Sequence, residues 1–429
     1  KIITAMTYRY PFVSWIQFYI QLSLLLSSIF SVTSVVQNCE ASSLGNESCS
    51  PRPESATTER YNLFEYILAE NYQSLDPDVP QTIVEIKKRG GHRCWHKHST
   101  FLGHLLGVHN ILRLWSQGQT IGRVGLLHSA YSNSYVNLAL FDPNSDEERI
   151  TVRNLVGSNV EELVYLFCVI DRQHVVVDTL LKQGYIPAEG LDVPHLRKAD
   201  EIIHLSPEVL RMLVVFTMAD ISDQYFGWQD RLFGGETEVN SMLLPEDNPL
   251  EHESTALWPG LSKPGLWMSY LSKLGAVAST YIPQNNNTVL RDGNEIIKDA
   301  PPIFDNCTKT LSRNDEINAR DLYWSVVSGS VDPETETLYL KKCVELNPWA
   351  FEPRVMLAQK YLHDNLNYEA EIEARQALHL QQIWGTAWDK RMSFPAWVSW
   401  TRVLHQRAKK GMGWPSNSWD VNNFGMVNS

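Results

Sequence analysis

The stretch HSTFLGHLLGVHNILRLW, residues 98–115, decides the fold class because its apolar residues recur at the spacing of an α-helix. Intervals of four, three and four positions place these residues on one face: His104, Val108, Ile111 and Trp115. His109 falls on another side of the same helix. The pattern predicts an amphipathic helix that turns a histidine towards the protein core.

A second histidine follows in the next predicted helix, TIGRVGLLHSAY, residues 120–131. Ile121, Val124 and His128 share one face of that helix. A single histidine on an apolar face is usually a hydrogen-bonded core residue. Two histidines on successive helices that face one core favour a common site.

A carboxylate is expected in the same core. The stretch HLSPEVLRMLVVFTMADISDQY, residues 204–225, predicts a helix that starts at an N-cap Ser206 and a proline. Asp220 lies at the end of the apolar face of this helix. A buried carboxylate is costly unless it is paired or binds a metal. Arg149, Arg153 or a histidine is the expected partner.

Composition places the chain among globular proteins. Of its 429 residues, 43% are hydrophobic and 20% are charged, so the chain is long and apolar enough to bury a sizeable core. Its net charge of −12 argues against the cationic face of non-specific nucleic-acid binding, and no nucleic-acid partner is expected. Because no convincing strand alternation is present, the predicted fold is mainly α.

The N-terminal residues predict a targeting segment. No residue between Arg9 and Glu40 is charged, and the apolar run over residues 10–36 follows two cations. Residues 1–39 are therefore expected to be a signal peptide or a membrane anchor. This predicts the secretory pathway or membrane association through residues 10–36, with an organelle or the cytoplasm as the alternative.

Changes in composition divide the rest of the chain. Pro, Gly and Asn break regular structure in the middle, where GLWMSYLSKLGAVASTYI, residues 265–282, is the one helical piece. The predicted segments are a linker at 40–57, a helical domain at 58–235, an irregular connection at 236–310 and a second helical region at 311–425.

The second helical region contains one repeat-like unit, CVELNPWAFEPRVMLAQKYLHDNLNYEAEIEARQALHL, residues 343–380. Its pattern resembles a tetratricopeptide repeat, a helical hairpin that must stack on neighbours. Helical stretches at 316–328 and 334–345 supply one neighbour. Residues expected to pack the second helix of the unit are Tyr368, Ala370, Ala374 and Ala377. Two interpretations stand: a hairpin packed on the main domain, or a groove in 311–425 that binds a protein partner.

The order of the site residues resembles the HD superfamily of metal-dependent phosphohydrolases, whose pattern is His, then His-Asp, then Asp on successive helices. His104, His128 and Asp220 occur in this order. The resemblance extends distantly to the hydrolase domain of alarmone hydrolases. Residues 98–115 and 120–131 are most similar to an uncharacterised HD-like family of plants, algae and bacteria in which His-Ser is the usual form.

Plant and algal members of that family carry a tetratricopeptide-like tail that ends like FPAWVSWTRVL, residues 394–404. The resemblance therefore implies an HD-like helical domain followed by a tetratricopeptide-like helical region. It implies no activity, because none is known for the family.

The chain departs from the superfamily at its acids. Ser129 stands where the superfamily has its metal-binding aspartate, and Ser132 and Asn133 stand where alarmone hydrolases place catalytic acids. A hydroxyl is a weak, neutral ligand for Mn²⁺ or Mg²⁺, which prefer carboxylates. A histidine-rich set suits zinc or iron better.

Candidate residues follow from this comparison. The expected ligands of a zinc, iron or manganese ion are His104, His128, Asp220 and His98. The candidates for catalysis are Arg149 and Arg153, which would face an anionic substrate, and the acid–base candidates Glu161 and Glu162. Glu161 is also expected to form a capping box with Ser158 at the start of its helix.

Three functions are compatible with the sequence. The favoured one is a divergent HD-like domain, catalytically lapsed or remodelled, that binds a ligand or serves as a scaffold. The alternative is a metal-dependent phosphohydrolase acting on a nucleotide-like or other phosphorylated small molecule. An adaptor role through residues 311–425 is compatible with both.

Overall fold

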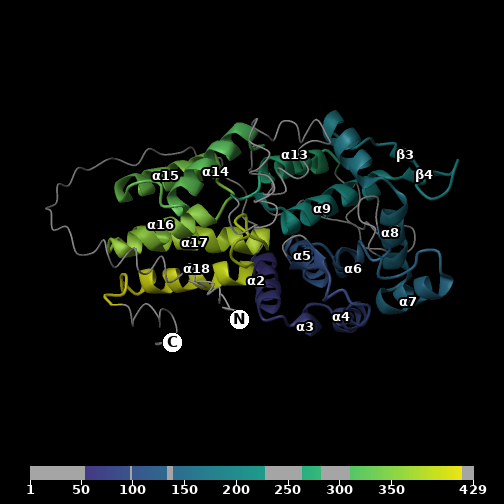
Figure 1. The fold of residues 1–429 in the computed structure, drawn as a ribbon, viewed down its shortest axis with the longest axis horizontal. Coiled ribbons are helices and arrows are strands. Elements are labelled where there is room, and N and C mark those ends of the chain that lie inside the picture. Colours follow the sequence, from purple (N-terminus) through teal and green to yellow (C-terminus); the bar gives the residue numbers. More distant parts are fainter. Residues whose placement is uncertain (1–53, 97–98, 133–138, 228–262, 282–309, 418–429) are drawn as a thin grey trace, which may run out of the picture. The chain divides into compact units, whose positions relative to one another are not determined.

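The computed structural model describes residues 54–96, 99–132, 139–227, 263–281 and 310–417, and these are mainly α-helical, as predicted (Figure 1). The described residues from Glu54 to Trp414 belong to one compact unit. The predicted targeting segment, 10–36, lies outside the described residues. Among the described helices, none combines the length and the hydropathy that crossing a membrane requires.

The first helical region contains eight helices and two short hairpins among its described residues. Its helices are α2 (Glu54–Leu68), α3 (Tyr72–Leu75), α4 (Val79–Lys88), α5 (Phe101–Leu114), α6 (Gln119–Leu127), α7 (Asp146–Val156), α8 (Ser158–Val169) and α9 (Pro207–Gln224), and a π-helical turn spans His174–Leu181. The antiparallel hairpins pair β1 (Trp95–His96) with β2 (Ser99–Thr100) and β3 (Leu191–Pro194) with β4 (Ile202–Leu205). Helix α5 packs against α6 and α9.

Polar caps fix where the two longest helices of the site begin. The Thr100 hydroxyl accepts a hydrogen bond from the Gly103 amide at the start of α5. The Ser206 hydroxyl does the same for the amide of Val209, which confirms the predicted N-cap of α9.

The predicted capping box of α8 is wrong. This helix starts at Ser158 after Gly157, whose φ of 95° is a conformation that favours glycine, and no side chain caps it. The Glu161 carboxylate instead accepts hydrogen bonds from arginines of α7. These charge-assisted bonds are stronger than the bond to a backbone amide in a capping box.

The second helical region is helical over the stretches predicted to be helices. The helices after the first region are α13 (Met268–Ser279), α14 (Arg313–Val327), α15 (Pro333–Leu346), α16 (Glu352–His363), α17 (Asn367–Trp384) and α18 (Phe394–Lys409). Each helix from α15 to α18 packs on the one before it. The three alanines of α17 are fully buried, whereas Tyr368, predicted to pack with them, is 74% exposed because it lies in the first turn of the helix.

A cluster of buried tryptophans joins the two regions. The ring of Trp384 at the end of α17 lies 5.4 Å from that of Trp267 and 6.4 Å from that of Trp115, centroid to centroid. All three side chains are excluded from solvent. Trp115 follows α5, so the helix that carries His104 ends against the second region. This packing favours the interpretation of a helical hairpin docked on the main domain.

Candidate metal centre

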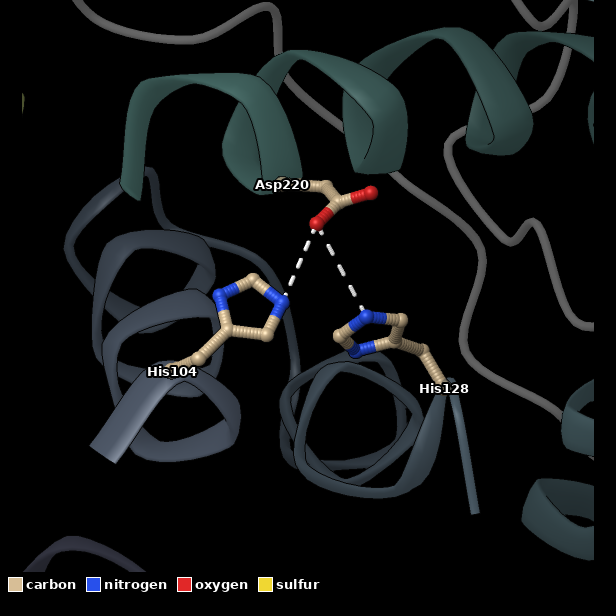
Figure 2. A group of neighbouring side chains, drawn as sticks. All are labelled: His104, His128 and Asp220. Atoms are coloured by element: carbon tan, nitrogen blue, oxygen red, sulfur yellow. Dashed lines mark ion pairs between the residues drawn. The ribbon is translucent and has the colours of Figure 1, made fainter. Parts of the chain in front are cut away.

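Three buried side chains from three helices converge in the first region (Figure 2). His104 comes from the first turn of α5, His128 from the residue after α6, and Asp220 from the last turns of α9. One ligand atom of each lies within 4.8 Å of the others. The structure thus brings together the three residues whose order resembles the HD pattern.

The carboxylate of Asp220 lies between the two imidazoles. Its Oδ1 atom is 3.2 Å from His104 Nε2 and 3.7 Å from His128 Nε2. This oxygen is buried and forms an ion pair with His104, but it makes no hydrogen bond of regular geometry. A buried carboxylate is costly unless it is paired or binds a metal, and a cation between these three atoms would bind this oxygen directly together with both imidazole nitrogens.

His128 is held with its Nε2 lone pair towards this point. Its Nδ1 lies 2.8 Å from the carbonyl oxygen of Gly125, which can only accept, so Nδ1 carries the proton. Burial, assisted by the charges of His104 and Arg172, lowers the pKa of His128 to about 3. The neutral ring therefore presents an unprotonated Nε2, the form that binds metals.

His104 has carboxylates at both of its nitrogens. Nδ1 lies 2.7 Å from Asp223 Oδ2, and Nε2 faces Asp220. Burial acts to lower the pKa of His104, but the two facing carboxylates outweigh it and raise the pKa to about 9. In the metal-free protein the Nε2 proton sits where a cation would bind, and a metal would have to displace it. The bond from Nδ1–H to Asp223 would remain and orient the ring.

A glycine makes room for Asp223. A Cβ atom on Gly107 would lie 1.9 Å from Asp223 Oδ1, far inside contact distance. Gly107 follows His104 by three residues on α5 and so lies on the same face. A larger residue at position 107 would therefore displace the Asp223 carboxylate from its contact with His104 Nδ1.

Arg172 closes the other side of the site. Its Nη2 atom lies 2.5 Å from Asp220 Oδ2, and its guanidinium stands 5.0 Å from the centre of the Phe216 ring. Burial acts to raise the pKa of Asp220, but the Arg172 charge and the two histidines hold it well below its usual value. The Arg172 side chain is 19% exposed, so it connects the buried triad with the surface.

The predicted catalytic residues of α7 and α8 form a different cluster. Glu161 is fully buried, and its carboxylate accepts three hydrogen bonds. The donors are Arg149 Nε at 2.7 Å, Arg153 Nε at 2.9 Å and the Tyr131 hydroxyl at 2.9 Å. Burial acts to raise the pKa of Glu161, but these three donors outweigh it and lower the pKa. Glu161 is thus a poor proton donor, and neither arginine is the partner of Asp220. Glu162 is exposed to solvent.

Replacing Glu161 with alanine should therefore cost stability and not metal. We expect a loss of about 2–3 kcal/mol in the free energy of unfolding, because two arginines lose their buried partner but regain some solvent. Urea unfolding measures this, with the exposed Glu162→Ala as the matched control, expected within about 0.5 kcal/mol of the parent. Unchanged stability together with lost metal would place Glu161 in the metal site instead.

The positions that depart from the HD pattern carry no acid towards the triad. Ser129 is buried directly after His128. The Ser132 hydroxyl accepts a hydrogen bond from Arg197 Nη2 at 3.0 Å, and its backbone has a φ of 66°. Asn133 and the fourth ligand candidate, His98, lie outside the described residues.

The segment that contains α5, α6 and α8 is similar in sequence to a known domain family. Residues 85–172 match the model of a domain of unknown function, DUF6817. The matched domain includes His104, His128 and Arg172, whereas Asp220 and the second helical region lie beyond it. No curated protein and no solved structure matches the chain.

Two residues beside the triad are missing from the sequence-based candidates. Asp223 is three residues after Asp220 and hence on the same face of α9, so helical spacing was a sufficient signal. Arg172 lies between α8 and the π-helical turn, at the end of the matched domain. A residue in such a connection has no helical or strand spacing that would predict which core it faces.

Proposed function

We propose that the first helical region is a divergent HD-like domain in which His104, His128 and Asp220 hold one divalent metal ion. The observation that carries this proposal is the convergence of three buried ligand atoms within 4.8 Å, with Asp220 Oδ1 between two imidazole nitrogens and without a regular hydrogen bond. The order of the three ligands along the chain supports it, because it resembles the HD superfamily. The supports of the two imidazoles, Asp223 and the Gly125 carbonyl, are those that metal-binding histidines usually have.

The chemistry of the donors favours zinc or iron(II). Two imidazole nitrogens and one carboxylate form the usual protein part of an open zinc site and of non-haem iron sites. Manganese and magnesium prefer oxygen ligands, and the buried triad has lost the aspartate that Ser129 replaces. A zinc or iron(II) ion bound here would supply a Lewis acid with open coordination positions.

Metal analysis of the purified protein tests the proposal. The protein is stripped with a chelator, supplied in turn with Zn²⁺, Fe²⁺ and Mn²⁺, separated from free ions and analysed. We expect about one equivalent of Zn²⁺ or Fe²⁺ per chain and less Mn²⁺. A parent protein that retains none of the three ions would show a lapsed site whose buried ion pairs serve only the fold.

Substitutions at Ser129 show how far the site has been remodelled. Ser129→Ala should leave the metal content unchanged, because a neutral hydroxyl adds little to ligation. Ser129→Asp should raise the Mn²⁺ affinity about tenfold by restoring a carboxylate next to His128. Titration with Mn²⁺ compares the three proteins. A loss of Zn²⁺ from Ser129→Ala would make the hydroxyl a ligand and contradict this assignment.

A second candidate function is the hydrolysis of a phosphorylated small molecule. Arg172 favours it, because a partly exposed guanidinium beside a metal centre is suited to bind a phosphate group. In this role Arg172 would bind and orient the substrate anion while Asp223 keeps His104 in place.

The metal-loaded protein should then hydrolyse a member of a panel of nucleotides and sugar phosphates. Arg172→Lys should raise KM, because a lysine cannot form the paired hydrogen bonds of a guanidinium. A metal-loaded parent that is inactive on the whole panel would leave metal binding as the function of the site.

A further inference from the structure

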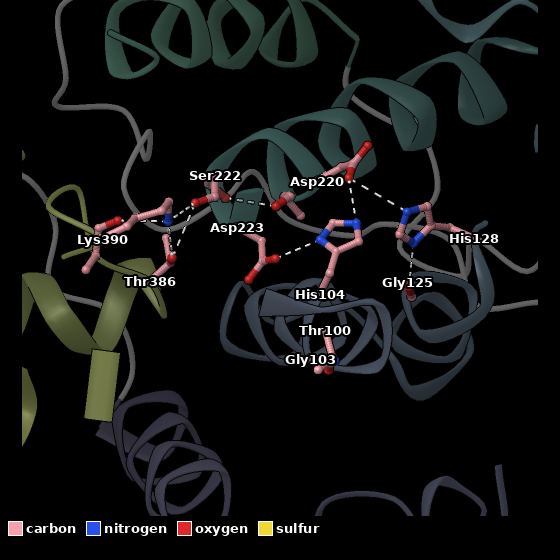
Figure 3. A network of polar contacts seen from close by, with 12 residues as sticks. Thr100, Gly103, His104, Gly125, His128, Asp220, Ser222, Asp223, Thr386 and Lys390 are labelled. Atoms are coloured by element: carbon pink, nitrogen blue, oxygen red, sulfur yellow. Dashed lines mark hydrogen bonds and ion pairs between the residues drawn. The ribbon is translucent and has the colours of Figure 1, made fainter. Parts of the chain in front are cut away.

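The cluster around the triad continues into the second helical region (Figure 3). Lys390 belongs to the loop between α17 and α18, and its Nζ atom lies 2.7 Å from the carbonyl oxygen of Ser222. Ser222 lies in the last turn of α9, between Asp220 and Asp223. The second region therefore touches the short segment that carries both aspartates of the site.

The C-terminal end of α9 carries negative charge that no basic residue of its own last turn balances. The last four carbonyl groups of an α-helix have no partner within it, and they form the negative end of the helix dipole. Two aspartates at this end add further negative charge, and the last turn of α9 contains no basic residue. Lys390 supplies the missing charge from the other region, close enough to interact with Asp223.

The Lys390 ammonium is fixed in place by three acceptors. Besides Ser222, it donates to the hydroxyl of Thr386 at 3.0 Å and to the carbonyl of Ala387 at 3.0 Å. The Thr386 hydroxyl itself donates to the Ser222 carbonyl at 3.3 Å. Because an ammonium has three protons, this set uses all of its donors, and Lys390 is suited to holding a position rather than to attacking a substrate.

From these contacts we infer that Lys390 is a positioning residue of the metal site. It holds the last turn of α9 so that Asp220 meets the two histidines and Asp223 meets His104. The second helical region is then part of the metal-binding machinery, and metal binding and docking of this region stabilise one another. The inference rests on the proposed metal site.

The test measures the Zn²⁺ affinity of stripped full-length protein by competition with a chromophoric chelator. Lys390→Met should weaken Zn²⁺ binding about tenfold, the lower end of what removing an outer support of a metal site costs. Thr386→Val, a milder change that removes the second hydrogen bond to the same carbonyl, should weaken it about two- to threefold. It keeps the test informative if Lys390→Met does not fold.

Arg402→Met is the matched control. Arg402 of α18 also ties the second region to the first through an ion pair, but its partner is Glu65 of α2, far along the chain from α9. This variant should keep the parental Zn²⁺ affinity even where it lowers the melting temperature. Equal losses of affinity in Lys390→Met and Arg402→Met would overturn the inference, because general loosening would then explain both.

A double-mutant cycle identifies the route of the effect. In an Asp223→Asn background, Lys390→Met should weaken Zn²⁺ binding less than about threefold, because the carboxylate that it helps to position is already gone. Additive losses would overturn a role through Asp223. An unchanged affinity in Lys390→Met with a parent that binds Zn²⁺ would overturn the inference alone. A parent that binds no Zn²⁺ would overturn the metal site and the inference together.

Discussion

Replacing His128 with alanine should strip the metal from the protein. His128 supplies one of the three protein ligands, and its Nε2 is held towards Asp220 by the bond from Nδ1 to the Gly125 carbonyl. Losing a direct ligand should cost more than the roughly 10- to 100-fold in affinity that an outer support costs. Metal analysis after gel filtration should find less than about a tenth of an equivalent of Zn²⁺.

His109→Ala is the control for this experiment. His109 is also a fully buried histidine, but its Nδ1 lies 3.1 Å from the Asn110 side chain, and it is not part of the triad. Both variants should lose stability through the cavity that they leave. Only His128→Ala should lose metal. Equal metal contents in the two variants would contradict the assignment of His128 as a ligand.

Replacing Trp384 with alanine should have the largest effect on stability. Its side chain is fully buried between Trp115 and Trp267, and its Nε1 donates to the Trp349 carbonyl at 2.9 Å. Truncating a buried tryptophan typically costs about 3–5 kcal/mol, and here it also removes a hydrogen bond to a buried residue.

Urea unfolding compares this variant with Trp95→Ala, whose side chain is 69% exposed in the parent. The control should stay within about 0.5 kcal/mol. Because Trp384 joins the two helical regions, we also expect Trp384→Ala to unfold in two steps. A small loss in a single transition would contradict the view that the tryptophan cluster joins the regions.

Much of the triad could be predicted from the sequence because it depends on helical spacing. His104 is placed by its intervals to Val108 and Ile111, and Asp220 by its position at the end of a long apolar face. Such periodicity indicates which residues face a core. The order of the helices, read against the HD pattern, then indicated that the three faces share one core.

The pairing of charges could not be predicted in the same way. Arg149 and Arg153 are four residues apart and share a face of α7, but which carboxylate they meet depends on how α7 and α8 pack. The sequence predicted that one of these arginines or a histidine pairs with Asp220. The structure pairs both arginines with Glu161 and pairs Asp220 with Arg172 and His104. Contacts between different helices leave no pattern within either helix.

The short hairpins are a similar case. Strands β3 and β4 have only four residues each, and β3 ends with Pro194. A strand of this length is too short for an alternation of buried and exposed residues to stand out from chance. Lys390 was missed because its partner is a backbone carbonyl, which no residue type encodes.

Anomalous diffraction at the zinc edge tests the central claim most directly. Crystals of the Zn²⁺-loaded protein, measured above and below the edge, locate the ion without reference to any expected ligand. The account predicts a single strong peak between His104 Nε2, His128 Nε2 and Asp220 Oδ1, with Asp223 still bonded to His104 Nδ1. A zinc-loaded crystal without a peak between these three atoms, or with its ion bound elsewhere, would contradict it.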